Sequence, residues 1–352
     1  MTTKKVLFLL SVPIIFWFIT FFFFSPVSHR FQIQAVMATE IDLHFISYRY
    51  QNAERIKDGL ISEIRRLEKI FSSYDPESEL NYVNHNAFDR NILISKELYE
   101  VIEKGIRYGS LSNGLFDISI LPLIHLWRVT DKSYHKTPDQ EAIRETLERV
   151  NYGNIRLHQG QIRFMKDEMA LGLGGIAKGY IIDKGIEYLK QNGIDNALLN
   201  IGGDIYALGK TIHNKKWKID INNPRKKRFP TPFVGGLSIT NRALATSGDY
   251  ERFRMTDKGF RAHHILNPKT GYPTDRSISV SILATTAMDA DAIATTVFIL
   301  GPHKGLEFIN KLDDVEGFII YEEGKEIKWL MSIDFPFERL VSNRRLNSSK
   351  KD

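Results

Sequence analysis

Residues 172–208 read GLGGIAKGYIIDKGIEYLKQNGIDNALLNIGGDIYAL and join a glycine-rich turn to a helical pattern and a strand-like run. The pattern predicts a helix from about Ile176 to Gln191, because the Asn-Gly pair that follows is typical of a helix end. The apolar run at 197–208 predicts a strand. Its Gly202-Gly203 break indicates either a turn or bulge, or a ligand site.

Other elements are spread irregularly along the chain. Apolar residues spaced by three or four predict a helix over 56–71. The segment Thr137-Pro138-Asp139-Gln140 predicts a helix start, with the threonine as cap and the helix continuing to Val150. Residues 237–240 and 277–283 are strand-like, the latter with clear alternation. Because strands and helices interleave without regular βαβ order or a boundary, we expect a mixed α/β (α+β) fold in one compact body.

Composition excludes several classes of protein. The chain has 352 residues, of which 43% are hydrophobic and 26% charged, and Gly plus Pro number only 36. It is therefore neither collagen-like nor disordered as a whole. It contains no cysteine, which excludes a thiolate nucleophile, a disulfide and a Cys-ligated metal centre.

The N-terminus carries an apolar run over residues 6–24, VLFLLSVPIIFWFITFFFF. At about 1.5 Å per residue it roughly matches a ~30 Å hydrocarbon core. It is long and lacks a small-residue cleavage site, which favours an uncleaved anchor over a signal peptide. Lys4 and Lys5 precede it, so we expect a cytoplasmic N-terminus and an extracytoplasmic body at the inner or plasma membrane.

The net charge of +6 is concentrated at the two ends. Residues 1–30 carry three basic residues and no acid, and residues 339–352 carry five basic residues and one acid. The remaining 308 residues therefore have a net charge of −1. We divide the chain into an N-terminal transmembrane anchor or signal segment (1–30), a body (31–338) and a basic C-terminal tail (339–352), and expect no nucleic-acid partner.

The glycine-rich turn is the first candidate for chemistry. Backbone N–H groups at a helix start bind anions, and Lys178 in the first helical turn favours a phosphate, because a cation there otherwise opposes the helix dipole. A tight turn that needs glycine explains the pattern equally well. The sequence is not a Walker A loop, and its match to G-x-G-x-x-A lacks a doubly wound context.

Two further motifs each have a functional and a structural interpretation. Asp291 and Thr295 are four residues apart on a predicted helix, so their oxygens face the same way and suit Mg²⁺; the alternative is an aspartate that caps the helix. His263 and His264 are adjacent on a predicted strand, so at most one faces a given site. A surface turn with one packed histidine is the alternative.

Taken in order, eight motifs closely resemble the ApbE family of FAD:protein FMN transferases over roughly residues 35–320. They are Met37-Ala-Thr39, FSSYDPESELNYVN (71–84), GLFDISILPL (114–123), GGIAKGYIID (174–183), NIGGDIYALG (200–209), ATSGDYERF (245–253), HHILNPKTGYP (263–273) and DADAIATTVFILG (289–301). The body at 31–338 is thus expected to be a flavin transferase domain.

The resemblance implies a reaction and a site. Such enzymes bind FAD, use Mg²⁺, and attach FMN through a phosphoester to a Thr or Ser of a partner redox protein, releasing AMP. By position, Asp291, Thr295 and the carbonyl of Gly175 would ligate Mg²⁺, and His264 would help to deprotonate the acceptor hydroxyl. The implied FAD contacts are Met37, Ser73, Tyr74, Leu115, Phe116, Asp117, Lys178 and Leu266.

This chain departs from the family pattern at a few positions. Gly172 stands where the family often has Asp, which puts one flavin contact in doubt. Asn267 replaces a frequent Asp, and Gly175 replaces Ala or Thr, a harmless change if only its carbonyl is used. An Mg²⁺-dependent FAD pyrophosphatase and a non-catalytic FAD-binding protein remain alternative functions.

Overall fold

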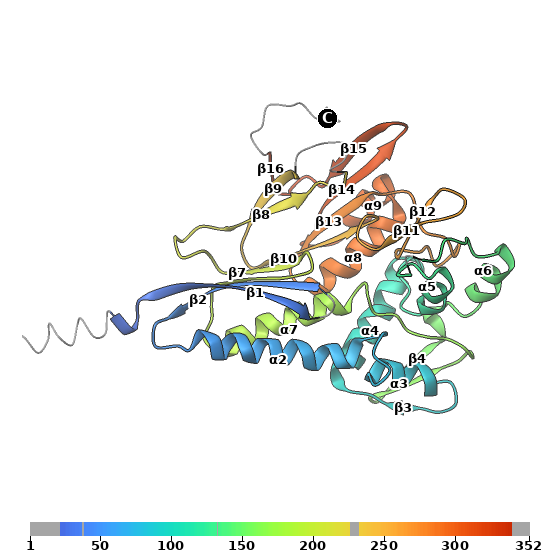
Figure 1. The fold of residues 1–352 in the computed structure, drawn as a ribbon, viewed down its shortest axis with the longest axis horizontal. Coiled ribbons are helices and arrows are strands. Elements are labelled where there is room, and N and C mark those ends of the chain that lie inside the picture. Colours follow the sequence, from blue (N-terminus) through green and yellow to red (C-terminus); the bar gives the residue numbers. More distant parts are fainter. Residues whose placement is uncertain (1–21, 37–38, 132, 226–231, 340–352) are drawn as a thin grey trace, which may run out of the picture.

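The computed structural model describes residues 22–36, 39–131, 133–225 and 232–339 (Figure 1). Its strands are β1 (Pro26–Val36), β2 (Thr39–Tyr48), β3 (Ile92–Leu93), β4 (Ile155–His158), β5 (Gln161–Phe164), β6 (Ala197–Ile201), β7 (Asp204–Leu208), β8 (Trp217–Asn222), β9 (Phe233–Ile239), β10 (Arg242–Gly248), β11 (Phe253–Met255), β12 (Arg261–His263), β13 (Ser279–Ala284), β14 (Glu316–Glu323), β15 (Glu326–Met331) and β16 (Phe337–Glu338). Its helices are α2 (Ala53–Phe71), α3 (Glu79–Asn86), α4 (Lys96–Leu111), α5 (Leu121–Trp127), α6 (Gln140–Leu147), α7 (Ala177–Gln191), α8 (Ala287–Leu300) and α9 (Pro302–Ile309), with a 3-10 turn at Tyr152–Asn154.

Eight strands form the central sheet in the order β1-β2-β6-β7-β10-β13-β14-β15. Every neighbouring pair in this sheet is antiparallel. Helices α2, α7 and α8 lie between strands in sequence but pack on the sheet rather than form βαβ units (Figure 1). The expected mixed α/β fold in one body is confirmed.

Both faces of the sheet are covered. Helices α7, α8 and α9 pack on one face, and the small sheet β16-β9-β8 covers the other. On β13, Ile282 belongs to the helix-side core and Leu283 to the core under the small sheet. All six residues of β13, which confirms the strand-like run at 277–283, are therefore buried.

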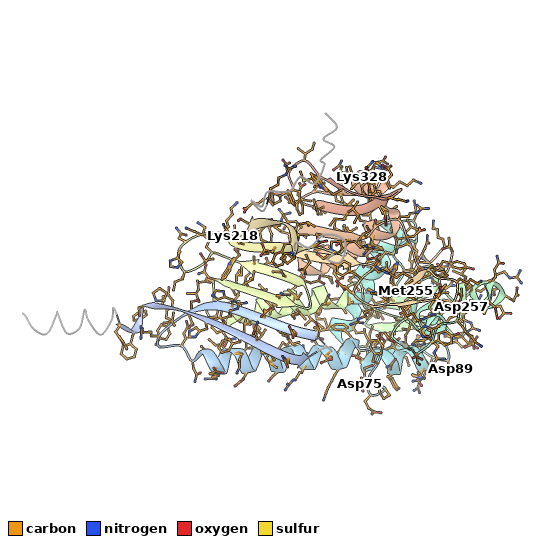
Figure 2. The ribbon with its side chains drawn as sticks, turned by 45° about the horizontal axis from the view of Figure 1, so that its top comes forward. Asp75, Asp89, Lys218, Met255, Asp257 and Lys328 are labelled. Atoms are coloured by element: carbon orange, nitrogen blue, oxygen red, sulfur yellow. The ribbon has the colours of Figure 1, made fainter. Side chains whose placement is uncertain are left out.

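The predicted helix at 56–71 is confirmed as α2, which Asn52 caps by accepting the N–H of Arg55 at 3.1 Å. The predicted start at Thr137 is wrong, because the helix begins at Gln140 with Asp139 as its cap and ends at Leu147. Thr137 instead donates its hydroxyl to Asp257 at 2.7 Å. Met255 ends β11, and Asp257 lies in the connection from β11 to β12; both side chains are labelled in Figure 2.

The apolar run 197–208 forms two strands, not one. Strands β6 and β7 pair through a turn at Gly202 and Gly203, which have φ values of 57° and 98°. L-residues with a side chain rarely adopt such φ values, so the turn requires glycine. The break at Gly202-Gly203 is therefore a turn between two strands, and its interpretation as a ligand site stays a prediction.

The ends of the body differ in part from the expected boundaries. Strand β1 begins at Pro26, so residues 26–30 belong to the sheet rather than to the N-terminal segment. Most of the apolar run, residues 6–21, lies outside the described residues, as does the tail from 340. Within the described ranges, no helix has the length and apolar character to cross a membrane. Near the gap at 226–231, the Arg225 guanidinium donates to both carboxylate oxygens of Asp249, at 2.8 and 2.6 Å.

Helices α7 and α8 approach each other closely near their N-termini. The carboxylate of Asp183 accepts the N–H groups of Ala287 and Met288 at 2.8 and 2.9 Å, which ties α7 to the start of α8. A Cβ atom on Gly179 would stand 2.2 Å from the carbonyl oxygen of Ala287. Only glycine permits this backbone approach.

We expect Gly179→Ala to lower the free energy of unfolding by about 3 kcal/mol or more, because the added methyl group collides with backbone that cannot rotate away. Gly174→Ala is the matched control, since a Cβ there meets no atom within 4 Å. That variant should be neutral or gain up to about 1 kcal/mol. Denaturant unfolding of both variants measures the difference, and equal stabilities would contradict the close approach.

Candidate functional site

The turn before α7 meets α8 beneath strand β10. A Cβ atom on Gly175 would stand 3.0 Å from the Oγ1 of Thr295 and 3.4 Å from the ring of Phe116. Ser247 on β10 approaches the same hydroxyl, with the two oxygens 3.3 Å apart. Three segments distant in sequence thus converge on Thr295.

Asp291 lies one turn before Thr295 on α8 and is 5% exposed. Its carboxylate accepts the N–H of Gly179 at 3.1 Å. The cap of α8 is Thr286, which accepts the N–H of Asp289 at 3.1 Å, so the interpretation of Asp291 as a helix cap is wrong. Burial, together with the charge of Asp204, raises the pKa of Asp291.

Lys178 and Asp204 form an ion pair beside Asp291, with 3.0 Å between Nζ and Oδ2. Asp204 is 2% exposed, and its other oxygen accepts the N–H of Thr246 at 3.0 Å. Burial lowers the pKa of Lys178, but the carboxylates of Asp204 and Asp291 outweigh it and hold the ammonium charged. Asp204 therefore already orients Lys178, the residue expected to contact a phosphate.

Carboxylates outnumber cations in this cluster. Glu251 is solvent-accessible yet surrounded by protein, and desolvation raises its pKa to about 7 against the opposing charge of Lys178. Asp204 and Asp291 bring the carboxylates that act on Lys178 to three, and Arg252 is a second cation that acts on Glu251. A divalent cation would balance this excess of negative charge.

The donor chemistry suits Mg²⁺. A carboxylate from Asp291, a hydroxyl from Thr295 and a carbonyl from Gly175 are hard oxygen ligands, and Mg²⁺ usually leaves its remaining positions to water and substrate phosphate. The described part of the chain has no group of three or more His, Cys, Asp and Glu side chains arranged to hold a metal. The three proposed ligands therefore differ from a metal site in which protein side chains alone surround the ion.

His263 is the last residue of β12 and His264 follows the strand, and the two rings have different surroundings. His263 is buried, with its Nε2 2.7 Å from the carbonyl oxygen of Thr274. His264 is half-buried, with its Nδ1 3.3 Å from the carbonyl oxygen of Arg252. Burial, helped by the charges of His263, Arg252 and Lys178, lowers the pKa of His264 to about 4, so its ring is neutral at pH 7.

The expected flavin residues occupy varied positions. Met37 lies outside the described residues. Phe116 is buried beside Gly175 and packs edge-on against the Tyr108 ring, while Leu115 is half-buried at the edge of the core. The Asp117 carboxylate accepts Ser119 N–H and Oγ–H and the N–H of Tyr152, and burial raises its pKa. Protein donors thus already hold Asp117.

Three other expected flavin residues lie on two further segments of the chain. Ser73 and Tyr74 lie in the loop between α2 and α3, and Tyr74 is 68% exposed. Leu266 is buried with Trp127 in a small core beside α5. Across the described ranges, no hydrogen bond or ion pair joins these three residues to the Asp291 cluster, and their flavin contacts stay predictions.

Sequence reasoning assigned no role to Asp204, Ser247 or Glu251, although all three lie in quoted motifs. The available signal was Asp204 itself, an acidic residue directly after a Gly-Gly turn and before a buried strand. A carboxylate in such a strand needs a partner, and the structure supplies Lys178.

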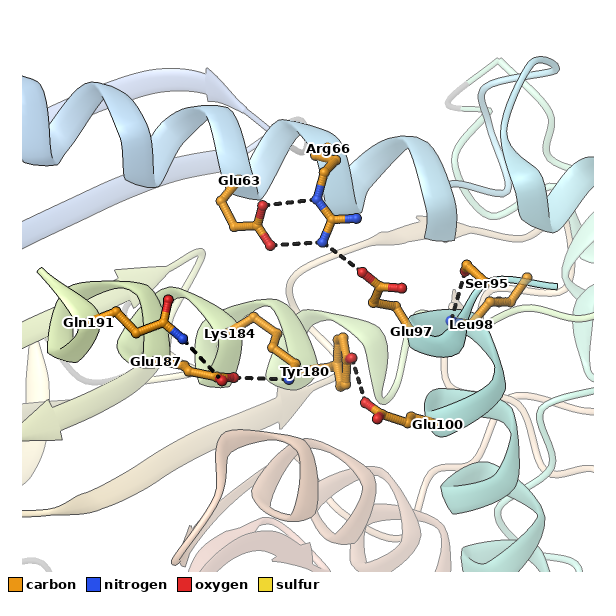
Figure 3. Close-up of polar contacts among 10 residues, drawn as sticks. All are labelled: Glu63, Arg66, Ser95, Glu97, Leu98, Glu100, Tyr180, Lys184, Glu187 and Gln191. Carbon is orange, nitrogen blue, oxygen red and sulfur yellow. Dashed lines mark hydrogen bonds and ion pairs between the residues drawn. The ribbon is translucent and has the colours of Figure 1, made fainter. Parts of the chain in front are cut away.

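A second polar region lies between α2, α4 and α7 (Figure 3). There Arg66 bridges Glu63 and Glu97 at 2.8 Å each, and the Tyr180 hydroxyl donates to Glu100 at 2.7 Å. The groove measures about 370 Å³ and contains none of the predicted site residues. Its charges pair with one another and tie the three helices together.

Replacing Lys178 by methionine should lower the free energy of unfolding by about 3 kcal/mol without Mg²⁺, because it leaves buried Asp204 without its cation. Lys184→Met, two turns along the same helix, is the control: its pair with Glu187 is exposed and contributes at most about 0.5 kcal/mol. Denaturant unfolding at pH 7 compares them. Equal losses would show that the Lys178 pair is no more important than a surface pair.

Several known proteins resemble this chain in sequence. A family model for the ApbE family matches residues 37–319. The FAD:protein FMN transferase of Klebsiella pneumoniae (strain 342) is 30% identical over 274 residues, which cover 77% of this chain and 84% of that protein. The FAD:protein FMN transferase of Treponema pallidum (strain Nichols) is 30% identical over 277 residues, covering 74% and 75%.

The fold also has solved counterparts. The flavin transferase ApbE from Vibrio cholerae superposes with a TM-score of 0.80 over 89% of this chain and 100% of its own. Sequence identity between the two is 24%, so this likeness concerns the fold.

Proposed function

The chain belongs to the ApbE family, and we propose that it is an Mg²⁺-dependent FAD:protein FMN transferase that modifies a Thr or Ser of a redox partner protein. The observation that carries the proposal is the convergence of Gly175, Asp291 and Thr295 at the N-terminus of α7. The positive end of the α7 dipole, beside hard oxygen ligands, suits a pyrophosphate and its metal.

The proposed reaction is a substitution at phosphorus. The acceptor hydroxyl oxygen bonds to the phosphorus on the FMN side of the FAD pyrophosphate, the bond to the bridging oxygen breaks, and AMP leaves with that oxygen. The hydroxyl proton passes to a base. Mg²⁺, when bound, would neutralise charge on the phosphates as the bond breaks.

Residues of this chain would orient the phosphates of FAD and deprotonate the acceptor hydroxyl. Asp204 holds Lys178 where its ammonium can meet a phosphate oxygen at the start of α7. His264 has a neutral ring at pH 7 and follows the short strand β12, which makes it the proposed proton acceptor. Phe116 beside Gly175 gives the site an apolar wall.

Gly172 bears on the flavin contact that the family often makes with Asp. Its N–H donates to the Ile118 carbonyl at 2.8 Å, and a Cβ there would stand 3.3 Å from the Leu121 side chain. A larger side chain would thus press on α5. We propose that this chain binds flavin without a carboxylate at 172.

We also propose that the apolar run at 6–24 anchors the body outside the cytoplasm at the inner or plasma membrane. The support is its length, its lysine flank and its freedom from acidic residues. The acceptor would then be a protein reachable from the same side of the membrane.

A mass-spectrometric assay tests the function. The full chain is incubated with FAD, Mg²⁺ and an acceptor protein carrying a Thr in an exposed Gly/Ser/Thr-rich segment. We expect an FMN adduct on that Thr together with stoichiometric AMP. Free FMN and AMP without adduct would indicate a pyrophosphatase, and intact FAD would indicate a binding protein; either result overturns transfer.

A further inference from the structure

Five large aromatic side chains gather at the open end of the β1–β2 hairpin. Phe22, Phe23, Phe24, Tyr48 and Tyr50 are between 43% and 60% exposed, and we call them the aromatic cluster. Pro26 pairs with Tyr48 at this end, so the cluster joins the entry to β1 with the exit from β2. Figure 1 shows this end of β1 and β2 at the edge of the molecule remote from β3.

The rings are organised against one another. The rings of Tyr48 and Tyr50 lie parallel within 7°, with centroids 5.8 Å apart, and the Phe24 ring lies 5.3 Å from that of Tyr50. The guanidinium of Arg49 stands 4.7 Å from the centre of the Phe22 ring, and its Nε donates to the Ser25 hydroxyl at 2.9 Å. An exposed patch built this way indicates an interaction surface.

Chain continuity identifies the occupant. Phe22–Phe24 are the last residues of the apolar run at 6–24, and no linker separates that run from β1 at Pro26. If residues 6–21 enter a bilayer, Phe22–Phe24 must lie at its surface, and the ring contacts bring Tyr50 and Tyr48 to the same level. Phe, Tyr and a snorkelling Arg are the side chains that suit this interfacial layer.

We propose that the aromatic cluster lies in the interfacial layer of the membrane and fixes the orientation of the body on it. The inference rests on the anchor proposed above and adds a second contact, from Tyr48 and Tyr50, that a simple tether would not make. The lipid surface is the proposed occupant, rather than a second copy of the chain or another protein.

The contact also places the aromatic cluster and the site at opposite ends of α7. Gln51, next to the cluster, donates its side-chain amide to the Asn192 carbonyl at the end of α7, 3.1 Å away. The Asp291 site lies at the opposite end of α7. A helix of 15 residues is about 22 Å long, so the site stands about that distance along α7 from the lipid-facing end.

The absence of cysteine makes a direct test simple. A nitroxide is attached to Tyr50→Cys in the full chain, reconstituted in vesicles of phosphatidylethanolamine and phosphatidylglycerol, and its accessibility to oxygen and to a water-soluble nickel chelate is measured. We expect oxygen to reach the label at 50 better than nickel. Leu93→Cys, 75% exposed on β3, is the control and should show the reverse.

The outcomes separate the contact from the anchor and from catalysis. A label at 50 that nickel reaches as easily as at 93, in chains that float with the vesicles, overturns the contact alone. Strong dipolar coupling between labels at 50 would assign the patch to a second copy and also overturns it. Chains that do not float overturn the anchor and the contact together, while FMN transfer by the labelled chain, measured separately, reports on the proposed function.

Discussion

Replacing Asp291 by asparagine should lower the Mg²⁺-dependent rate of FMN transfer by more than about 100-fold. Asp291 supplies the only carboxylate among the three proposed ligands, and its amide analogue keeps the size but not the charge. The side chain is 5% exposed, so water cannot easily replace it. The rate is measured as adduct formed per unit time across a Mg²⁺ titration.

The neighbouring threonines provide a matched control for this metal site. Thr295 faces Ser247 and Gly175, whereas the buried Thr296 hydroxyl donates to the Ala292 carbonyl at 2.8 Å within α8. We expect Thr295→Val to raise the Mg²⁺ concentration needed for half-maximal rate and Thr296→Val to leave it unchanged. Full activity in Asp291→Asn, or equal effects of the two valine variants, would refute the ligand assignment.

Replacing His264 by alanine should lower the single-turnover rate of transfer by about 10²–10⁴-fold, the usual contribution of a positioned general base. With a pKa near 4, the ring is neutral above about pH 5. Its capacity to accept a proton is therefore fully present from pH 5 to 8 and is lost as the pH falls through 4. The pH–rate profile of the native chain should show that acid limb.

His303→Ala is the control, because His303 is an exposed histidine on α9 that packs against the Tyr321 ring. Its rate should match the native chain. Glu251, whose pKa lies at about 7, is the alternative base. Two results together would assign the role to it: a pH–rate profile whose acid limb lies near pH 7 and disappears in Glu251→Gln, and a His264→Ala variant that is still active.

Local sequence patterns predicted helices well where short-range interactions alone specify them. Helix α2 follows from its apolar spacing and α7 from its apolar pattern and Asn-Gly end, because short-range backbone and side-chain forces specify both. The start of α6 was misplaced because the Thr137 hydroxyl found a distant partner, Asp257, instead of the helix N-terminus. Strand β13 alternates in sequence but is buried on both faces, because a second sheet covers one of them. The residues of β13 do not indicate that this second sheet is present.

In the candidate site too, local sequence indicated some residues, whereas their contacts appeared only in the structure. Residue types and spacing indicated the glycine turn, Asp291 and Thr295, because hard oxygen ligands are properties of side chains. The choice of His264 over His263 came only from the resemblance to the ApbE family. The partners of these residues were not predictable in this way. Asp204 pairs with Lys178, and Ser247 approaches Thr295, across 26 and 48 positions of chain that only the sheet brings together.

The amino-acid sequence establishes that this chain is cysteine-free, nearly neutral in its body, apolar at its start and equipped with motifs that resemble those of flavin transferases. Only the tertiary structure shows which charged side chains lie together and which aromatic side chains form an exposed patch. It placed three carboxylates around one lysine and stacked Tyr48 and Tyr50 beside Phe24. The physical reason is that pKa values and exposed patches depend on which residues become neighbours, and long-range strand pairing chooses those neighbours.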